Sequence, residues 1–283
     1  MNKISVIVPC YNEEESLTAF HRETAAVLKK IEEADYEFVF VDDGSSDKTL
    51  EIIKELAAED SHVRYVAFSR NFGKEAGMYA GLSEASGDYM VIMDADLQHP
   101  PALLPAMYEA VSKEGYDLCG GLRMGREGDS KLRGIFSRAF YKVSKKLTHM
   151  DMSDGHGDFR MMNRKVAEAI LEMKEYNRYM KGLFSFVGFD TKWIEYESVE
   201  RVMGKSKWNF KSLFSYAFEG ILSFSTAPLK LAGLIGCLLF IGGLAFMGIN
   251  LVQSIGAGGA ITSFDIVIFA LLMLSSLQML FIY

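Results

Sequence analysis

The feature that most constrains the fold is a long stretch near the C-terminus that is almost free of charge. Residues 231–264 contain no charged side chain, and after Asp265 the chain stays uncharged to Tyr283. A bilayer-spanning helix needs about 20 predominantly apolar residues. Because the Gly-rich segment 254–259 divides the stretch, we expect two transmembrane helices, at about 230–252 and 264–283. The alternative is a buried hairpin in a soluble core.

Charge is distributed unevenly along the chain, whose formal net charge is −7. Residues 1–120 carry −13 and residues 121–283 carry +6, and the turn between the apolar segments has no Lys or Arg. Because basic residues favour the cytoplasmic side, we expect a multi-pass protein of the cell (inner or plasma) membrane with a cytoplasmic N-terminal domain. Three widely spaced cysteines form no metal or disulfide pattern, which fits a reducing compartment. We expect no nucleic-acid partner.

Upstream of the apolar stretch, short runs typical of strands alternate with helical patterns. The runs at 3–8, 36–41, 63–68, 89–93 and 116–121 predict strands. The segments between them predict helices that reach residue 33 and cover 48–59, 76–85 and 101–114. This alternation predicts an α/β domain with a doubly wound, mostly parallel sheet and right-handed crossovers.

The predicted strand at 89–93 ends in two carboxylates that are separated by one residue, Asp94 and Asp96. Ligands of open parallel sheets bind at the carboxyl ends of the strands, so we expect chemistry at this point. Paired hard oxygen ligands suit Mg²⁺ or Mn²⁺ carrying a diphosphate. The alternative is a polar loop whose aspartates cap the next helix.

Two other predicted strands end in polar loops at the same sheet edge, Tyr11-Asn12-Glu13 and Asp42-Asp43. An aromatic side chain, several carboxylates and a metal pair could together hold the base, ribose and diphosphate of a nucleotide. The alternative for the two adjacent aspartates is an Asx turn. The chain has no G-x-G-x-x-G after its first strand and no G-x-x-x-x-G-K-[ST], which argues against a dinucleotide cofactor and against a P-loop.

The motifs PCYNEEES, VDDGSSDKT, SRNFGKEAG, DADLQHPP and GDFRMMNR, in this order and spacing, resemble those of family 2 glycosyltransferases. More narrowly, they are similar to the polyprenyl-phosphate branch, which includes bactoprenol-phosphate glucosyltransferases and dolichyl-phosphate mannose synthase. The similarity covers the whole chain, including the two apolar segments. VDDGS and the Asp-x-Asp occur across a wide superfamily, whereas DLQHPP together with GDFR is more specific.

The resemblance implies roles for particular residues. A nucleotide pocket would be lined by Pro9, Tyr11, Asn12, Glu13, Asp42, Asp94 and Ala95, and a metal would be held by Asp94, Asp96 and Gln98. Asp158 would be a base that faces the acceptor. A lipid phosphate with a second pKa near about 6 hardly needs deprotonation, so orientation of Arg160 or of the acceptor is the alternative role for Asp158.

Basic residues form the rest of the expected site. Arg123, Arg201 and Lys207 are expected to stabilise charge on the departing diphosphate. Residues 131–149 show a basic amphipathic pattern, and its Arg133 and Arg138, with Lys205, are expected to meet an acceptor phosphate or an anionic membrane surface. Packing of that helix on the sheet, and simple membrane attraction of the basic residues, are the alternatives.

These observations predict three regions: a GT-A-like nucleotide-sugar-binding domain at 1–207, an interfacial amphipathic helix at 208–228 and two transmembrane helices within 229–283. The expected reaction is inverting, metal-dependent transfer of a sugar from a nucleotide diphosphate sugar, a UDP-sugar such as UDP-glucose or a related UDP-hexose, to polyprenyl (undecaprenyl) phosphate at the cytoplasmic leaflet of the lipid bilayer. The alternatives are a family 2 transferase with another acceptor in surface polysaccharide synthesis, and a catalytically silent nucleotide-sugar-binding membrane subunit. Small residues in the spans indicate helix packing and a homo-oligomer, namely Gly233, Gly236, Gly242 and Gly243.

Overall fold

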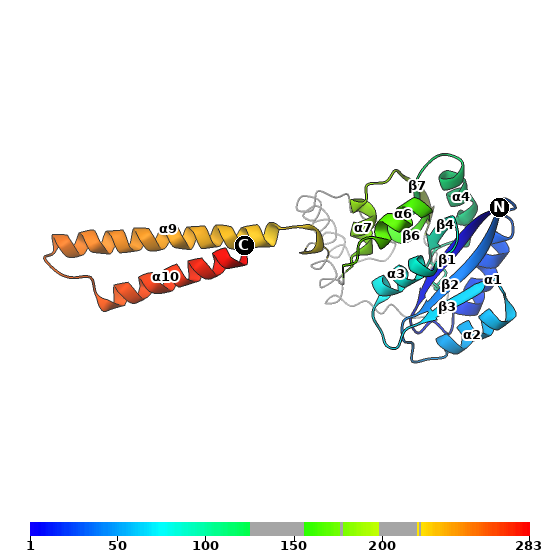
Figure 1. Ribbon diagram of the computed structural model, residues 1–283, viewed down its shortest axis with the longest axis horizontal. Coiled ribbons are helices and arrows are strands. Elements are labelled where there is room, and N and C mark those ends of the chain that lie inside the picture. Colours follow the sequence, from blue (N-terminus) through cyan, green and yellow to red (C-terminus); the bar gives the residue numbers. More distant parts are fainter. Residues whose placement is uncertain (125–155, 176–177, 198–219, 221) are drawn as a thin grey trace. The chain divides into compact units, whose positions relative to one another are not determined.

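The computed structural model describes residues 1–124, 156–175, 178–197, 220 and 222–283 (Figure 1). The chain divides into two compact units, Met1–Ser223 and Phe224–Tyr283. The amphipathic helix predicted at 131–149 lies outside the described residues, as does most of the one predicted at 208–228.

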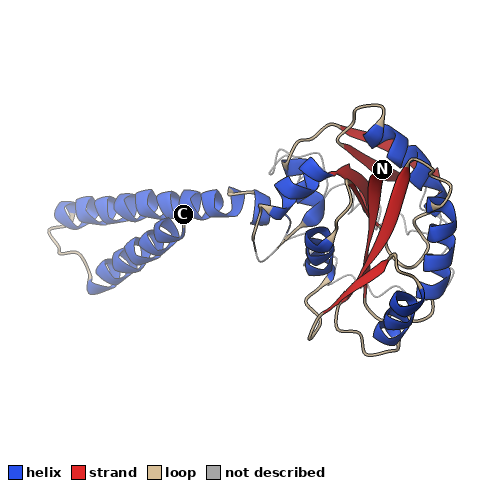
Figure 2. Ribbon diagram, turned by 45° about the vertical axis from the view of Figure 1, so that its right-hand side comes forward, coloured by secondary structure: helices blue, strands red, loops and turns tan. Residues whose placement is uncertain are grey.

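The first unit is built on a seven-stranded sheet (Figure 2). Its order is β3-β2-β1-β4-β6-β5-β7, in which β6 runs antiparallel to β4 and β5 while the remaining pairs are parallel. The mostly parallel sheet is therefore confirmed, and the five predicted strands correspond to β1–β5. The strands are β1 (Asn2–Cys10), β2 (Ala34–Asp42), β3 (Val63–Ala67), β4 (Tyr89–Ile92), β5 (Leu118–Met124), β6 (His156–Asn163) and β7 (Thr191–Glu197).

Helices cover both faces of this sheet (Figure 1). One layer contains α1 (Leu17–Leu28), α2 (Thr49–Glu59), the 3₁₀ turn η1 (Pro101–Leu103) and α4 (Leu104–Ser112). Phe20 of α1 and Met107 of α4 share a buried core with Val6 of β1. The opposite layer contains α3 (Lys74–Glu84) and α6 (Arg164–Leu171), and the short α7 (Met180–Phe186) contacts β6. Alternate residues of β1 thus face opposite layers, as a doubly wound sheet requires.

The approach of α3 to the sheet depends on a glycine. A Cβ atom at Gly81 would overlap the side chain of Ile7 on β1, so only glycine allows this helix to lie so close to the strand. The helix predicted to reach residue 33 ends earlier, because α1 covers Leu17–Leu28. Glu13, Glu14 and Glu15 precede the helix instead of occupying its first turn, because the Glu13 carbonyl accepts hydrogen bonds from the amides of Ser16 and Leu17 in a tight turn.

The second unit is a pair of packed helices, α9 (Ala227–Gly256) and α10 (Ser263–Ile282), each long and apolar enough to cross a membrane. The 20 residues of α10 extend about 30 Å, which matches the hydrocarbon core of a bilayer. Gly233 and Gly236 are buried against α10, whereas Gly242 faces open space. Gly233 and Gly236 therefore allow close packing of the two helices within this chain, and self-association stays a prediction.

Candidate functional site

Three parallel strands end side by side at one edge of the sheet. The amide of Asp43 donates to the carbonyl of Cys10 over 2.8 Å, and the amide of Met93 donates to the carbonyl of Ile7 over 3.0 Å. The loops that follow β1, β2 and β4 carry most of the residues predicted to form the site. Carboxyl ends of parallel strands are the usual place for a ligand in such a sheet.

The loop after β1 is joined to the loop after β2. Asn12 has a left-handed backbone (φ 53°), and its side-chain oxygen accepts a hydrogen bond from the amide of Ser46 over 2.8 Å. The amide of Glu13 donates to the hydroxyl of Thr49 over 2.7 Å. Both residues were predicted to line a nucleotide pocket, and both also hold the two loops together. Pro9 is the last residue but one of the same strand, and Tyr11, which follows the strand, is exposed.

The neighbours Asp42 and Asp43 are both buried but have different surroundings. Among the described residues, the side chain of Asp42 accepts only long hydrogen bonds, of 3.4 Å from the amide of Ser45 to each carboxylate oxygen. Asp43 accepts short hydrogen bonds from the amides of Phe72 (2.6 Å) and Gly73 (2.9 Å), immediately before α3. Burial raises the pKa of Asp43, and these two amides partly oppose that rise. Asp43 therefore fixes the start of α3.

The Asp-x-Asp segment forms a tight turn after β4. The amide of Asp94 donates to Nδ1 of His99 over 3.1 Å, and the ring of His99 stacks on Phe159 of β6. The amide of Gln98 donates to Asp96 over 3.1 Å, and Ala95 between the two aspartates is buried. Burial lowers the pKa of His99, so the ring is neutral and can accept this hydrogen bond. His99 thus supports the backbone of the turn.

A lysine that the sequence analysis did not single out lies at the centre of the site. Nζ of Lys74, the first residue of α3, is 2.7 Å from Oδ1 and 2.9 Å from Oδ2 of Asp94, and 2.8 Å from Oδ2 of Asp158. Burial lowers the pKa of Lys74, but the two carboxylates outweigh that effect and raise it above its ordinary value. A basic residue directly after a glycine at a helix start, where acidic residues are favoured, was the available signal.

Asp158 lies on β6, which brings it to the same edge as Asp94. Burial raises its pKa, but the charges of Lys74 and then Lys181 outweigh burial and hold the pKa below the usual range. Its Oδ1 atom is buried and has no hydrogen-bond partner among the described residues. Arg160, two residues further along β6, places its guanidinium over the rings of Phe184 (4.6 Å) and Trp193 (5.0 Å).

The predicted basic residues are only partly placed. Arg123 is near the end of β5, and its Nε atom is buried without a hydrogen-bond partner in the described part of the chain. The remaining basic residues predicted for the site lie outside the described residues, namely Arg133, Arg138, Arg201, Lys205 and Lys207.

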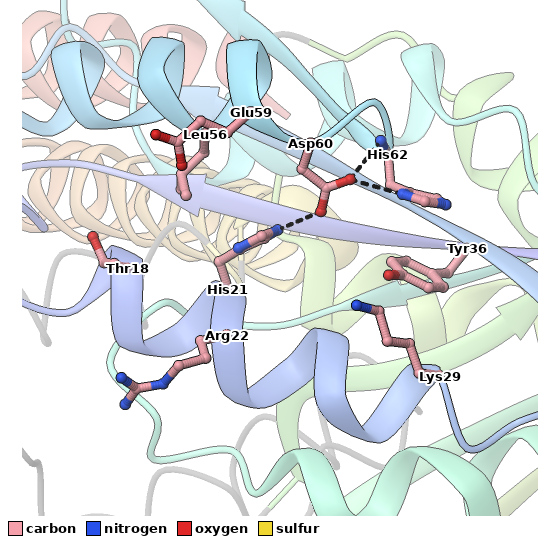
Figure 3. Close-up of a pocket in the computed structure, with 9 residues that line it drawn as sticks. All are labelled: Thr18, His21, Arg22, Lys29, Tyr36, Leu56, Glu59, Asp60 and His62. Carbon is pink, nitrogen blue, oxygen red and sulfur yellow. Dashed lines mark hydrogen bonds and ion pairs between the residues drawn. The ribbon is translucent and has the colours of Figure 1, made fainter.

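A separate pocket of about 450 Å³ lies between α1, α2 and the starts of β2 and β3 (Figure 3). In it, Asp60 contacts Nε2 of His21 (3.0 Å) and Nδ1 of His62 (2.7 Å), and the ring of His62 stacks on Tyr36. These groups satisfy one another, and no residue predicted for the site lines this pocket. The pocket is distinct from the carboxylate cluster, which consists of Asp94, Asp96 and Asp158.

The carboxylate cluster is chemically suited to a divalent cation. Asp94 and Asp96 offer hard oxygen ligands. Oδ1 of Asp158, which has no hydrogen-bond partner among the described residues, is a further acceptor. The site already accommodates the positive charge of Lys74. The described residues contain no group of three or more His, Cys, Asp or Glu side chains placed as metal ligands. Two carboxylates, those of Asp94 and Asp96, suit an ion whose other ligands come from phosphate and water.

Solved structures of glycosyltransferases share this fold. Glucosyl-3-phosphoglycerate synthase of Mycobacterium tuberculosis, solved with Mn²⁺ and uridine-diphosphate-glucose, matches with a TM-score of 0.55 at 19% identity, over 77% of this chain and 76% of that one. Mannosyl-3-phosphoglycerate synthase of Rubrobacter xylanophilus matches with a TM-score of 0.54 at 14% identity, over 82% and 75%. The first unit therefore has a GT-A-like fold.

Sequence similarity then identifies the family. The profile of glycosyl transferase family 2 matches residues 5–171. CsbB of Bacillus subtilis is 41% identical over 277 residues, covering 98% of this chain and 83% of that protein. Bactoprenol glucosyl transferase of Shigella phage SfV is 37% identical over 279 residues, covering 98% and 90%. The chain belongs to glycosyl transferase family 2, and it is a glycosyltransferase enzyme.

Proposed function

We propose that this enzyme transfers a hexose from a nucleotide diphosphate sugar, with UDP-glucose as the first candidate, to a polyprenyl phosphate at the cytoplasmic leaflet of the membrane. The observation that carries the proposal is the extent of the similarity to bactoprenol glucosyl transferase, which covers 98% of the chain and so includes both candidate membrane helices. A soluble acceptor would not require such helices. The basic segments at 131–149 and 200–211 fit the same membrane surface.

The loops that follow β1, β2 and β4 are suited to hold the nucleotide-sugar donor. Tyr11 is exposed beside the edge and can stack on a base, and Asp42, whose carboxylate makes only long contacts, can accept hydrogen bonds from base or ribose. Asp94 and Asp96, with Gln98, would hold Mg²⁺ or Mn²⁺ against the diphosphate. When bound, the metal supplies Lewis-acid stabilisation of the leaving diphosphate. Arg123, Arg201 and Lys207 would add fixed positive charge.

The chemistry is a single inverting displacement. An oxygen of the lipid phosphate forms a bond to the anomeric carbon, while the bond from that carbon to the diphosphate breaks and its electron pair leaves with the nucleotide. A lipid phosphate is largely dianionic at neutral pH, so no proton has to be removed from it. The ion pair between Asp158 and Lys74 supports an orienting role for Asp158 rather than that of a base.

The test uses purified full-length protein with polyprenyl phosphate in detergent, Mg²⁺ or Mn²⁺, and radiolabelled UDP- and GDP-sugars. We expect label to move into the organic phase with one donor, and to fall by about 10²-fold or more in Asp96→Asn. Addition of EDTA should also abolish the transfer. If no donor gives lipid-linked label although nucleotide binds, the proposal is wrong, and a soluble acceptor or a catalytically silent subunit takes its place.

A further inference from the structure

Lys74 contacts the carboxylate that is proposed to hold the metal. Its ammonium lies 2.7 and 2.9 Å from the two oxygens of Asp94, so it covers the edge of the carboxylate on which a divalent cation would chelate. The same nitrogen reaches Asp158 over 2.8 Å. A Mg²⁺ ion binds carboxylate oxygens at about 2.0–2.1 Å. An ion on this edge of Asp94 would have to share it with a positive charge at close range, which is strongly unfavourable.

The backbone of Lys74 is anchored on both sides, and its side chain is long and unbranched. Asp43 fixes the residues before α3 through the amides of Phe72 and Gly73. On the other side, Glu75 accepts a hydrogen bond from the amide of Met180 over 3.0 Å. The lysine stem has four rotatable bonds beyond this anchored backbone and is about one-third exposed. The ammonium can therefore leave Asp94 without movement of the helix.

We propose that Lys74 is a resident counterion that competes with the divalent cation for Asp94, and that the diphosphate of the donor draws its ammonium away as the metal binds. This inference rests on the proposed function, because it assumes a metal–diphosphate ligand at the same site. In the absence of donor, Lys74 pairs with Asp94 and Asp158, and with donor present it adds a positive charge beside the phosphates. Metal and nucleotide then bind cooperatively, each favouring the other by the same factor.

The test measures Mn²⁺ binding by electron paramagnetic resonance of the free ion, with full-length protein in detergent and no sugar transfer required. Without nucleotide, we expect Lys74→Met to bind Mn²⁺ at least about tenfold more tightly than the wild type, because the competing charge is gone. Addition of UDP should tighten Mn²⁺ binding strongly in the wild type and much less in Lys74→Met. Lys74→Arg, which keeps the charge, should behave as the wild type does.

The control is Lys54→Met, which removes the same charge from an exposed position on α2 and should leave Mn²⁺ affinity unchanged. Lys74→Gln removes the charge but keeps a hydrogen-bond donor, and it gives the same comparison if Lys74→Met does not fold. Equal or weaker Mn²⁺ binding by the uncharged variants overturns the inference, and so does failure of every protein to bind Mn²⁺. Equal binding with intact sugar transfer contradicts only the role of Lys74. Tighter binding without transfer to lipid from any donor contradicts only the proposed acceptor.

Discussion

Adjacent residues of one motif have separate physical roles at this site. Asp42 has no short hydrogen bond among those described for its side chain, whereas Asp43 accepts two from the residues that precede α3. Gly44, the next residue, has φ 67° and packs against the backbone of Arg70, so a side chain there would collide with it. The loop after β2 is thus fixed against the segment that precedes α3. Lys74 is therefore placed by residues that need not touch the substrate.

We expect Asp43→Ala to lower the stability of the catalytic domain. The substitution leaves two part-buried amides without their charged acceptor, at a cost of about 2–4 kcal/mol. In a domain of this size that corresponds to a fall of roughly 5–10 °C in the thermal unfolding midpoint. Glu55→Ala, at an exposed position of α2, is the matched control and should change little. An unchanged midpoint for Asp43→Ala would mean that the loop is held by other contacts.

The role of Asp158 can be tested through the pH dependence of sugar transfer. Lys74 and Lys181 hold the pKa of Asp158 below its usual range, against the effect of burial, and so favour its ionised form. We expect transfer to fall at low pH with an apparent pKa near about 6, set by the lipid phosphate. Asp158→Asn should reduce the rate but keep this acidic limb. Disappearance of the limb in the variant would instead identify Asp158 as the titrating base.

At the scale of whole elements, a buried carboxylate joins three segments at the edge of the sheet opposite the site. Glu37 of β2 accepts hydrogen bonds from the ammonium of Lys3 on β1 (2.9 Å) and from the hydroxyl of Ser5 (2.6 Å). The amide of Ser86, in the loop that leads into β4, donates to it over 2.7 Å. Glu37 therefore fixes the relative position of the strands whose other ends carry the site.

Stability should depend on pH through this group. Burial raises the pKa of Glu37, but the hydrogen bonds from Ser5, Lys3 and Ser86 outweigh it and lower the pKa from 4.5 to about 2. Its contribution, about 3 kcal/mol, is present above pH 4.5 and is lost as the pH falls toward 2. Thermal unfolding of Glu37→Gln should show a clear deficit against the wild type at pH 7 that shrinks at pH 3. A deficit independent of pH would show that packing, and not charge, is responsible.

Four of the five strands that sequence patterns predicted contain apolar runs with β-branched residues, namely β1–β4. β6 was not predicted, because HGDFRMMN contains Gly157 and charged residues and has no β-branched side chain. Its strand conformation comes from antiparallel pairing with β4 and β5, both of which precede it in the chain by more than 30 residues in the pairing register. Pairing of this kind is a tertiary effect that overrides local propensity. This pairing determines the positions of Asp158 and Arg160.

At the scale of the whole molecule, a polar catalytic unit and an apolar helical pair occur in one chain. Of 30 residues in α9, none after Lys230 is charged, and α10 has only Asp265, which forms a capping box with Thr262 at the helix start. This polar cap fits an end of the helix that meets water. Under the proposed topology, the turn between the two helices faces the outside of the cell.

A labelling experiment tests this topology. In full-length protein with Cys10, Cys119 and Cys237 replaced by alanine, Ala260→Cys in the turn should react with a membrane-impermeant maleimide in intact cells. Ser61→Cys, at an exposed position before β3, should react only after lysis. The reason is the excess of Lys and Arg on the side of the catalytic unit. The reverse pattern of labelling would place the catalytic unit outside and contradict a cytoplasmic donor.

The sequence by itself determined the α/β class, five of the strands, the apolar helices and the family, because hydrophobic periodicity, length and motif order are local properties of the chain. It also predicted that Asp94 and Asp96 lie at a strand end. Only the tertiary structure placed Lys74 between Asp94 and Asp158, which are 20 and 84 residues away from it. It also separated the roles of Asp42 and Asp43. Those contacts depend on strand order and on the antiparallel β6, and no local pattern encodes which distant side chains a sheet edge brings together.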